Sequence, residues 1–340
     1  MRLSLIALFI VTIVFLLALR SSRDEKVKFV YPADWPKPTY NFKKNPPTID
    51  GIALGRKLFY DPKLSRDSMI SCASCHLSFT GFTHIDHKVS HGIEDRIGTR
   101  NTGSLINLAW QKSFMWDGSV NHLDFQPLAP LTNPVEMDAD LNTIVNYLKS
   151  DSTYKVMFEK AFGKKAEINT PNMLKAFSQF MLQIKSFNSK YDKVKRGEDQ
   201  FASLEAEGYE LFKDNCASCH SEPLFTNQQF ANNGLEVDPK YNDGGRIKVT
   251  GLVEDSLKFK VPTLRNIEVT YPYMHDGRFK SLQMVIHHYV HNVKQTPNLA
   301  PELDRPIILK EAEKRALIMF LKTLTDKEFL YNKSLSFPRT

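Results

Sequence analysis

Apolar residues recur at helical spacing along much of the chain, and alternating strand patterns are scarce. The clearest helical stretches are residues 140–151, 171–184, 282–293 and 313–324. In the first of these, Leu141, Ile144, Val145 and Leu148 fall on one face of the helix. Ser281 precedes the third stretch as a typical N-cap. The pattern therefore predicts an all-α protein.

Two stretches interrupt this helical pattern and divide the chain. Residues 27–47 are rich in proline and aromatic residues, and residues 186–200 are polar and charged. A length of 340 residues also favours two domains. The predicted organisation is a hydrophobic leader over 1–23, an extended lead-in over 24–48, a first domain over 49–188, a linker over 189–200 and a second domain over 201–332.

The two predicted domains carry the same motifs in the same order, which indicates a duplication. The run "GRKLFYDPKLSRDSMISCASCH" in the first domain matches "GYELFKDNCASCH" in the second. Downstream, an Arg-Asn pair in each domain (100–101 and 265–266) leads to Met-x-Asp-Gly and then to a Leu five residues after the Gly. The matched positions are Met115, Asp117, Gly118 and Leu123 with Met274, Asp276, Gly277 and Leu282.

All four cysteines lie in two copies of Cys-Ala-Ser-Cys-His. Cys-x-x-Cys-His is the attachment motif of c-type haem, in which both thiols bond to the porphyrin and the histidine binds iron. A redox dithiol would need a βαβ context, a four-cysteine zinc site uses shorter spacings, and a disulfide does not explain two identical pentapeptides. We therefore predict two cytochrome c-like domains, each with one covalent haem. The predicted ligands are Cys72, Cys75 and His76 for haem 1 and Cys216, Cys219 and His220 for haem 2.

Charge and the N-terminus limit the setting of such a protein. Leu3–Leu19 is a mostly apolar run after Arg2, typical of a secretory signal or an uncleaved membrane anchor. The lack of an Ala-x-Ala cleavage site favours the anchor, and either form exports the rest of the chain. The net charge of +7 comes with scattered lysines and no basic run interleaved with aromatic residues. Nucleic acid is therefore not an expected partner.

The two halves differ where a second axial iron ligand is expected. Fifteen residues after the repeated methionine lie Tyr289 in the second half and Pro130 in the first, and proline has no donor atom. Haem 2 is then capped and suited to electron transfer, whereas haem 1 is open and can bind peroxide or oxygen. Gln126 and Glu136 supply polar groups beside the open face. A carboxylate there could move a proton between the two peroxide oxygens, although Glu136 could equally be a solvated loop acid.

With these residues in place, residues 49–324 resemble the bacterial di-haem cytochrome c peroxidase family, which includes the MauG-type enzymes. The likeness rests on "LGRKLFYDPKLSRDSMISCASCH", "GTRNTGSLIN", "FMWDGS", "LTNPVEM" and "FKVPTLRNIEVTYPYMHDGRF". It implies peroxide reduction at haem 1 with electrons entering through haem 2. It also implies that Glu136 is the distal acid–base group, that Gln126 and Pro130 belong to the distal pocket, and that Trp116 relays electrons between the haems.

The resemblance implies further ligands. A calcium ion between the domains would bind the side chain of Asn101 and the backbone carbonyl oxygens of Thr270 and Pro272. Tyr289 matches the sixth ligand of haem 2, as in MauG-type enzymes, whereas peroxidases that need reductive activation typically have methionine there. Met274 or a nearby histidine is the rival donor.

A histidine loop near haem 1 is also implied. In some family members such a histidine caps haem 1 at rest and leaves on activation, and His91 is the matching residue here. His84 and His87 are close enough in sequence to compete for this role, and a solvent-exposed loop histidine is the alternative.

The leading functional hypothesis is a periplasmic peroxidase that reduces hydrogen peroxide with electrons from a small cytochrome or cupredoxin. A MauG-like enzyme that oxidises residues of a partner protein uses the same haem pair and is the alternative. A non-enzymatic di-haem electron carrier would need donors on both irons, and Pro130 argues against it.

Overall fold

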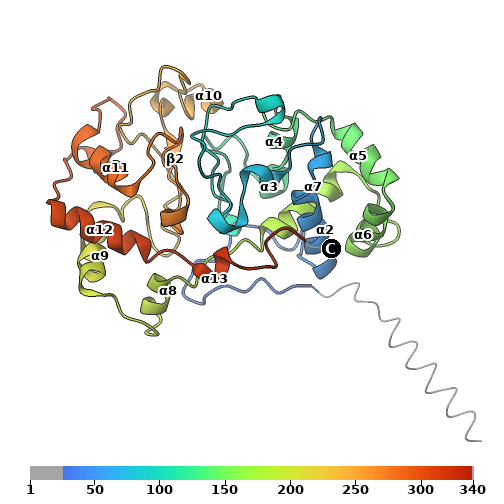
Figure 1. Ribbon diagram of the computed structural model, residues 1–340, viewed down its shortest axis with the longest axis horizontal. Coiled ribbons are helices and arrows are strands. Elements are labelled where there is room, and N and C mark those ends of the chain that lie inside the picture. Colours follow the sequence, from blue (N-terminus) through green and yellow to red (C-terminus); the bar gives the residue numbers. More distant parts are fainter. Residues whose placement is uncertain (1–25, 339–340) are drawn as a thin grey trace, which may run out of the picture.

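The computed structural model describes residues 26–338, which form two helical lobes side by side (Figure 1). The predicted hydrophobic leader over 1–23 lies outside the described residues. Within residues 26–338, no helix has the length and apolar character that crossing a bilayer requires. The mostly helical fold predicted from the sequence is confirmed, with one two-stranded ribbon of two residues per strand.

The N-terminal lobe is built around α2 (Ile49–Phe59) and α7 (Thr170–Met181). Helix α2 begins at Thr48, whose hydroxyl oxygen accepts a hydrogen bond from the Gly51 N–H at 3.0 Å. A Cβ at Gly55 would lie 1.9 Å from the Ala176 carbonyl oxygen, so a glycine is required for the two helices to pack this closely. Helices α5 (Leu141–Ser150) and α6 (Ser152–Phe162) cover the outer side of this pair (Figure 1).

The C-terminal lobe repeats this arrangement with α9 (Ser203–Asn215) against α12 (Glu311–Lys322). Here a Cβ at Gly208 would lie 2.0 Å from the Ala316 carbonyl oxygen, the same close approach as in the first lobe. Helix α11 (Leu282–His287) and the antiparallel strands β1 (Phe230–Ala231) and β2 (Phe259–Lys260) complete the lobe. Each lobe buries its own cluster of apolar side chains, so each has its own core.

Short elements connect these helices. They are η1 (Pro62–Leu64), α3 (Cys72–Cys75), η2 (Ser78–Thr80), η3 (Ile93–Asp95), η4 (Leu108–Trp110), η5 (Leu123–Phe125), α4 (Leu128–Thr132), α8 (Lys190–Lys195), α10 (Ile247–Thr250), η6 (Val253–Asp255), η7 (Ile267–Val269), η8 (His288–Asn292), η9 (Pro301–Leu303) and α13 (Lys327–Leu330). Most of the segments that bear the haem motifs are therefore loops and single turns, which the longer helices hold in place.

The four helices predicted from apolar spacing are all present, but one is not a uniform helix. Ser281 caps α11 as predicted, and its hydroxyl accepts from the Met284 N–H at 3.4 Å. The helix then continues from residue 288 as the π-helical turn η8. A π-helical turn carries one extra residue and is often found at functional sites. Tyr289 lies in this turn.

Downstream of the attachment motifs, which lie 144 residues apart, the duplication is visible in backbone geometry at an offset of 159 residues. Met115 and Met274 both have positive φ, at 66° and 73°, and so do Asn107 and Asn266, at 57° and 60°. The turns η4 and η7 follow the two asparagines at the same offset. The predicted match between the Arg-Asn pairs 100–101 and 265–266 is therefore wrong. Asn107 is the counterpart of Asn266, because both asparagines adopt the same left-handed conformation before the same turn.

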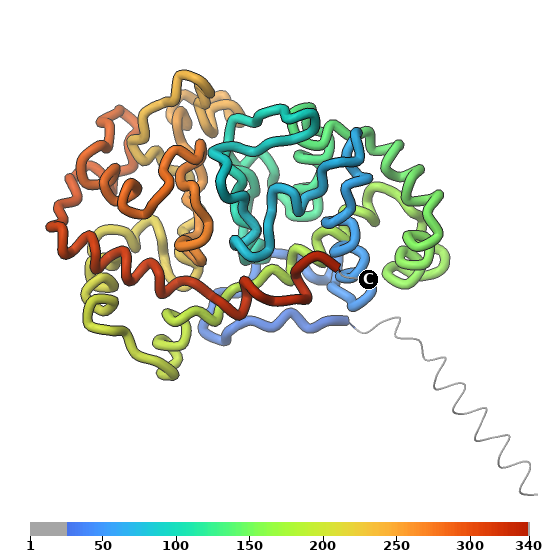
Figure 2. Tube along the Cα trace, in the orientation of Figure 1, coloured from blue at the N-terminus to red at the C-terminus, as the bar shows by residue number. Residues whose placement is uncertain are grey.

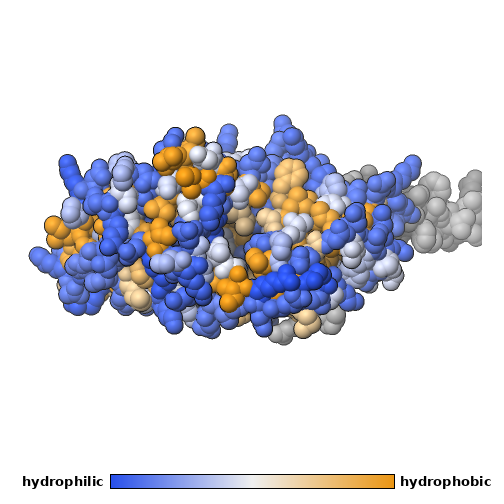
Figure 3. Space-filling view, turned by 90° about the horizontal axis from the view of Figure 1, so that it is seen from above, coloured by the Kyte–Doolittle hydropathy of each residue, from blue (hydrophilic) through white to orange (hydrophobic). Residues whose placement is uncertain are grey.

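Both ends of the described chain tie the lobes together (Figure 2). The lead-in passes below the N-terminal lobe to its junction with the C-terminal lobe, where the Trp35 ring packs against Trp110 and lies 4.6 Å from the Arg265 guanidinium. The last residues return to the N-terminal lobe, where Tyr60 donates a hydrogen bond to the Leu335 carbonyl at 2.7 Å. The face in Figure 3 is mostly hydrophilic, with apolar side chains in small groups.

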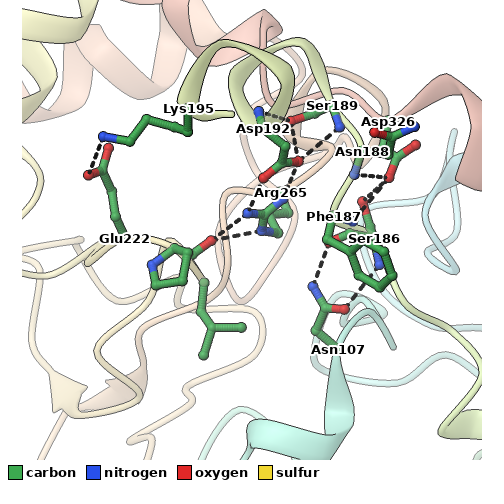
Figure 4. Close-up of polar contacts among 12 residues, drawn as sticks. Asn107, Ser186, Phe187, Asn188, Ser189, Asp192, Lys195, Glu222, Arg265 and Asp326 are labelled. Atoms are coloured by element: carbon green, nitrogen blue, oxygen red, sulfur yellow. Dashed lines mark hydrogen bonds and ion pairs between the residues drawn. The ribbon is translucent and has the colours of Figure 1, made fainter. Parts of the chain in front are cut away.

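The predicted linker is ordered and partly buried. Arg265, which is fully buried, makes two hydrogen bonds to the Asp192 carboxylate at 2.8 and 2.9 Å (Figure 4). Asp326 accepts from the hydroxyl of Ser186 and from the next two backbone N–H groups, and Asn107 bonds the backbone of Ser186. The polar residues of this segment therefore form hydrogen bonds that join the lobes, and the segment is not a flexible linker.

We expect Arg265→Met to destabilise the protein by about 3–5 kcal/mol, because it leaves the Asp192 carboxylate buried without its partner. Burial raises the pKa of Asp192, but the Arg265 guanidinium outweighs burial and holds that pKa below its usual range. The stabilisation is therefore present at neutral pH and is lost as pH falls through the folded-state pKa.

The measurement is the free energy of unfolding of the haem-loaded protein in guanidinium, followed by circular dichroism. Arg196→Met is the matched control, because its guanidinium pairs with Glu198 in an exposed ion pair and should cost less than about 1 kcal/mol. Equal losses in the two variants would contradict the prediction.

Candidate haem sites

A single cavity of about 750 Å³ is lined by residues of both lobes. This volume is within the range of about 300–1,000 Å³ that is usual for small-molecule and cofactor sites. All of the predicted site residues line it: Cys72, Cys75, His76, His91, Asn101, Trp116, Gln126, Pro130, Glu136, Cys216, Cys219, His220, Thr270, Pro272, Met274 and Tyr289. Residues predicted from separate motifs therefore come together in one place.

The first attachment motif forms the single helical turn α3, in which Ser74 Oγ accepts from the Ser71 N–H at 3.1 Å. His76 Nδ1 lies 2.7 Å from the Phe82 carbonyl oxygen, which leaves Nε2 available for a metal. Burial lowers the pKa of His76 to about 4, so the ring is neutral and can bind iron. Burial also raises the pKa of the Cys72 thiol to about 12.

The second motif follows α9 as a turn and gives its histidine the same support. His220 Nδ1 lies 3.2 Å from the Phe225 carbonyl oxygen and 3.1 Å from that of Pro262, and burial lowers its pKa to about 4. The four cysteines are unpaired in the described structure. Two thiols and one neutral imidazole in each lobe therefore fit covalent haem.

Pro130, Gln126 and Glu136, the residues predicted for the distal pocket, line the cavity in the N-terminal lobe. Glu136 Oε1 accepts a hydrogen bond from Asn133 Nδ2 at 3.1 Å. Burial raises the pKa of the Glu136 carboxyl, against the effect of this hydrogen bond. A hydrogen bond also holds the Glu136 backbone, because its carbonyl oxygen accepts from the Ile93 N–H at 2.8 Å. Glu136 is therefore enclosed and firmly placed, unlike a solvated loop acid.

The corresponding side of the second site holds Tyr289 and Met274. Asn233 Nδ2 lies 3.3 Å from the Tyr289 hydroxyl and 3.6 Å from the Met274 sulfur, so the two rival donors share one neighbour. Burial raises the pKa of Tyr289 to about 12. The competing histidines 287, 288 and 291 do not line the cavity. Sequence reasoning missed Asn233, for which no local motif gives a signal.

Trp116 lies at the contact between the lobes. Its Nε1 donates to the Asn101 carbonyl at 2.8 Å, and its own carbonyl accepts from the Lys260 N–H at 2.7 Å. Arg100 joins the same contact by pairing with Asp117 at 2.6 Å and with Asp243 from the other lobe. Trp116 is therefore held by hydrogen bonds to both lobes.

The predicted calcium ligands can be tested against the hydrogen bonds of this structure. Asn101 Nδ2 donates to the Lys88 carbonyl at 3.0 Å, which leaves the side-chain oxygen of Asn101 free to face the cavity. In residues 26–338, no donor reaches that oxygen or the carbonyl oxygens of Thr270 and Pro272. The same residues contain no cluster of three His, Cys, Asp or Glu side chains suited to a metal. The unpaired amide and carbonyl oxygens nevertheless fit a hard cation.

The structure also distinguishes the three loop histidines. The His91 carbonyl accepts from Cys75 Sγ at 3.4 Å, and His91 lines the cavity, whereas His84 and His87 do not. The rings nonetheless form a chain, with centroids 4.5 Å apart from 84 to 87 and again from 87 to 91. The role of His91 at haem 1 stays a prediction.

Comparison with known proteins places this fold and cavity in a family. The profile of the di-haem cytochrome c peroxidase family matches residues 50–200, and that of cytochrome c matches residues 205–325. The chain is 34% identical to methylamine utilization protein MauG of Methylorubrum extorquens, over 88% of this chain and 84% of that protein. It is also 34% identical to cytochrome c551 peroxidase of Nitrosomonas europaea, over 82% and 81%.

Among solved structures, a MauG-like protein associated with microbial copper homeostasis superposes with a TM-score of 0.81 and 31% identity, covering 91% of this chain and 99% of that one. The class is therefore a haem oxidoreductase with two cytochrome c-type domains. The chain belongs to the di-haem cytochrome c peroxidase family, which includes MauG.

Proposed function

We propose that the protein reduces hydrogen peroxide to water at the N-terminal haem site, with electrons delivered through the C-terminal one. The observation that carries this proposal is the asymmetry of two equivalent positions. At the same offset from the repeated methionine, the second lobe offers the Tyr289 hydroxyl and the first offers Pro130, which has no donor. Glu136 lines the cavity in the lobe that has the proline.

Bound haem iron supplies the redox chemistry, and the chain supplies substrate access and proton transfer. Pro130 has no donor atom, so it would leave one face of a bound haem iron free of a protein ligand. In the overall reaction, H2O2 with two electrons and two protons gives two waters, and the electrons would come through the C-terminal site. Glu136 would accept a proton from one peroxide oxygen and return it to the other. Its raised pKa suits this work, because a carboxyl that both accepts and releases a proton is most effective when its pKa approaches the working pH.

Three further roles belong to the same proposal. Trp116 carries electrons between the sites, since it lies on the hydrogen bonds that join the lobes. Asn101, Thr270 and Pro272 bind calcium, which would hold the lobes in register. His91 caps the first haem site at rest, a role supported by the contact of its backbone carbonyl with Cys75.

The MauG-type activity, oxidation of a residue in a partner protein, is the second candidate. Tyr289 favours it, because a phenolate is a hard anionic donor that stabilises oxidised iron. The electron carrier remains the weaker alternative, because it requires a donor at position 130. For the peroxidase we propose a small cytochrome c or cupredoxin as electron donor and the periplasm as location, because covalent haem attachment follows export.

The test is steady-state peroxide turnover with a reduced cytochrome c, and separately with a reduced cupredoxin. We expect two covalent haems per chain in the pyridine haemochrome assay and a kcat of about 1–10³ s⁻¹, the usual range for enzymes. The denatured haem-loaded protein controls for the background reactivity of haem. Two haems with turnover no faster than this control would contradict the peroxidase proposal and favour the alternatives.

A further inference from the structure

Lys260 lines the shared cavity, and neither haem attachment nor peroxide reduction uses it. Its Nζ donates to Gln111 Oε1 and to the Ser113 carbonyl, both at 2.7 Å. The two acceptors belong to the N-terminal lobe, and Lys260 comes from β2 of the C-terminal lobe. Burial lowers the pKa of Lys260 to about 8, so the group is charged at neutral pH.

The offset of 159 residues relates this contact to the predicted calcium ligands. Lys260 is the counterpart of Asn101, and the two acceptor positions 111 and 113 are the counterparts of Thr270 and Pro272. The relation holds in space as well as in sequence. The Asn101 N–H donates to the His275 carbonyl at 2.7 Å, and the Lys260 N–H donates to the carbonyl of Trp116, the counterpart of His275, also at 2.7 Å.

The two related places are completed differently. On one side, the carbonyl of Ser113 receives the Lys260 ammonium. On the other, no donor in residues 26–338 reaches the carbonyl of Pro272, and the short Asn101 side chain leaves an oxygen-lined space. The position beside Ser113 therefore holds a cation that belongs to the chain, whereas the position beside Pro272 offers oxygen ligands for a metal ion.

We propose that Lys260 is a positioning residue whose ammonium group acts as a built-in cation at neutral pH. In our proposal its ammonium group lies at the position in one half of the duplication that corresponds to the calcium site in the other half. There it binds residues 111–116 to the C-terminal lobe. Its positive charge also raises the reduction potential of the haems. The inference rests on the calcium part of the proposed function and is independent of peroxide chemistry. The two halves of the duplication would then each hold one cation at the contact between the lobes: the Lys260 ammonium in one and calcium in the other.

The charge of Lys260 is not cancelled by a carboxylate. Asp117, the acid whose charge raises the pKa of Lys260, is already paired with Arg100 at 2.6 Å, and in residues 26–338 Lys260 forms no ion pair of its own. A positive charge near an iron disfavours the more positive ferric state, because like charges repel most strongly where water is excluded. Removing the charge should therefore lower the reduction potential.

The first arm of the test compares Lys260→Met with Lys260→Arg in the calcium-loaded holoenzyme. Spectroelectrochemical titration measures both haem potentials. We expect a shift to lower potential in Lys260→Met and recovery toward the wild-type values in Lys260→Arg, which keeps the charge. Lys112→Met is the control, because this exposed lysine lies between the two acceptors in sequence but outside the cavity lining. Unchanged potentials in Lys260→Met would overturn the proposal, because a purely structural role predicts that result.

The second arm transfers the cation to the other side. Asn101→Lys should place an ammonium near the carbonyl oxygens of Thr270 and Pro272. We expect a chelator to alter the electron paramagnetic resonance spectrum of the wild type and to leave that of Asn101→Lys unchanged. This arm decides the question if Lys260→Met fails to assemble. Equal chelator effects in both proteins would overturn the equivalence. A wild type insensitive to chelation would overturn the calcium site and the symmetry argument while leaving peroxide reduction intact.

Discussion

Glu136→Gln is expected to lower peroxide turnover by about 10²–10⁴-fold, the range that general acid–base groups contribute. Glutamine keeps the shape of the side chain, and its amide oxygen can still accept the Asn133 hydrogen bond that now measures 3.1 Å. It cannot accept a proton from one peroxide oxygen and return it to the other. Both haem spectra and the haem count should therefore remain those of the wild type while turnover falls.

The pH profile gives a second reading of the same change. Burial raises the pKa of Glu136, and the base form is required first, so wild-type activity should fall as pH drops through this raised pKa. That acidic limb should be absent in Glu136→Gln.

Asp138→Asn is the matched control for this experiment. Asp138 lies two residues further on, pairs with Arg66 and Arg96, and does not line the cavity. If Asp138→Asn lost as much turnover as Glu136→Gln, the effect would come from disturbing the loop and not from proton transfer.

The two attachment motifs could be recognised in the sequence because each occupies five consecutive residues. The helices were predictable because buried faces repeat every three to four residues. The extra residue of the π-helical turn at Tyr289 was not, because a single added residue barely disturbs that spacing. The register of the duplication was misjudged because the same Arg-Asn dipeptide occurs twice, while backbone conformation identifies Asn107 and Asn266 as the true pair.

Residues that meet only when the chain has folded leave no local signal in the sequence. Asn233 touches both rival ligands of haem 2 although it lies 41 and 56 positions from them in the chain. Lys260 reaches acceptors more than 140 positions away. The buried pair of Arg265 and Asp192 spans 73 positions and makes the polar linker segment part of the structure. Such contacts depend on the folded chain, so composition and spacing could not reveal them.

Tyr289→Phe is expected to abolish the low-spin ferric signal of the C-terminal haem and replace it with a high-spin signal in electron paramagnetic resonance. Phenylalanine removes the donor oxygen with little change in volume. Burial raises the pKa of Tyr289 to about 12, so the hydroxyl stays protonated until a cation binds it. Bound ferric iron would be such a cation; Tyr289 would then bind it as a phenolate, which would lower the reduction potential of this haem.

Met274→Leu is the matched variant, because the Met274 sulfur lies 3.6 Å from the same Asn233 nitrogen that contacts the Tyr289 hydroxyl. It should leave the low-spin signal intact. A new low-spin signal in Tyr289→Phe that disappears in the double variant would show that the methionine replaces the lost donor. If the signal is instead lost in Met274→Leu and kept in Tyr289→Phe, methionine is the native ligand. The haem would then have a high potential, and the enzyme would need reduction before it reacts with peroxide, because methionine ligation favours ferrous iron.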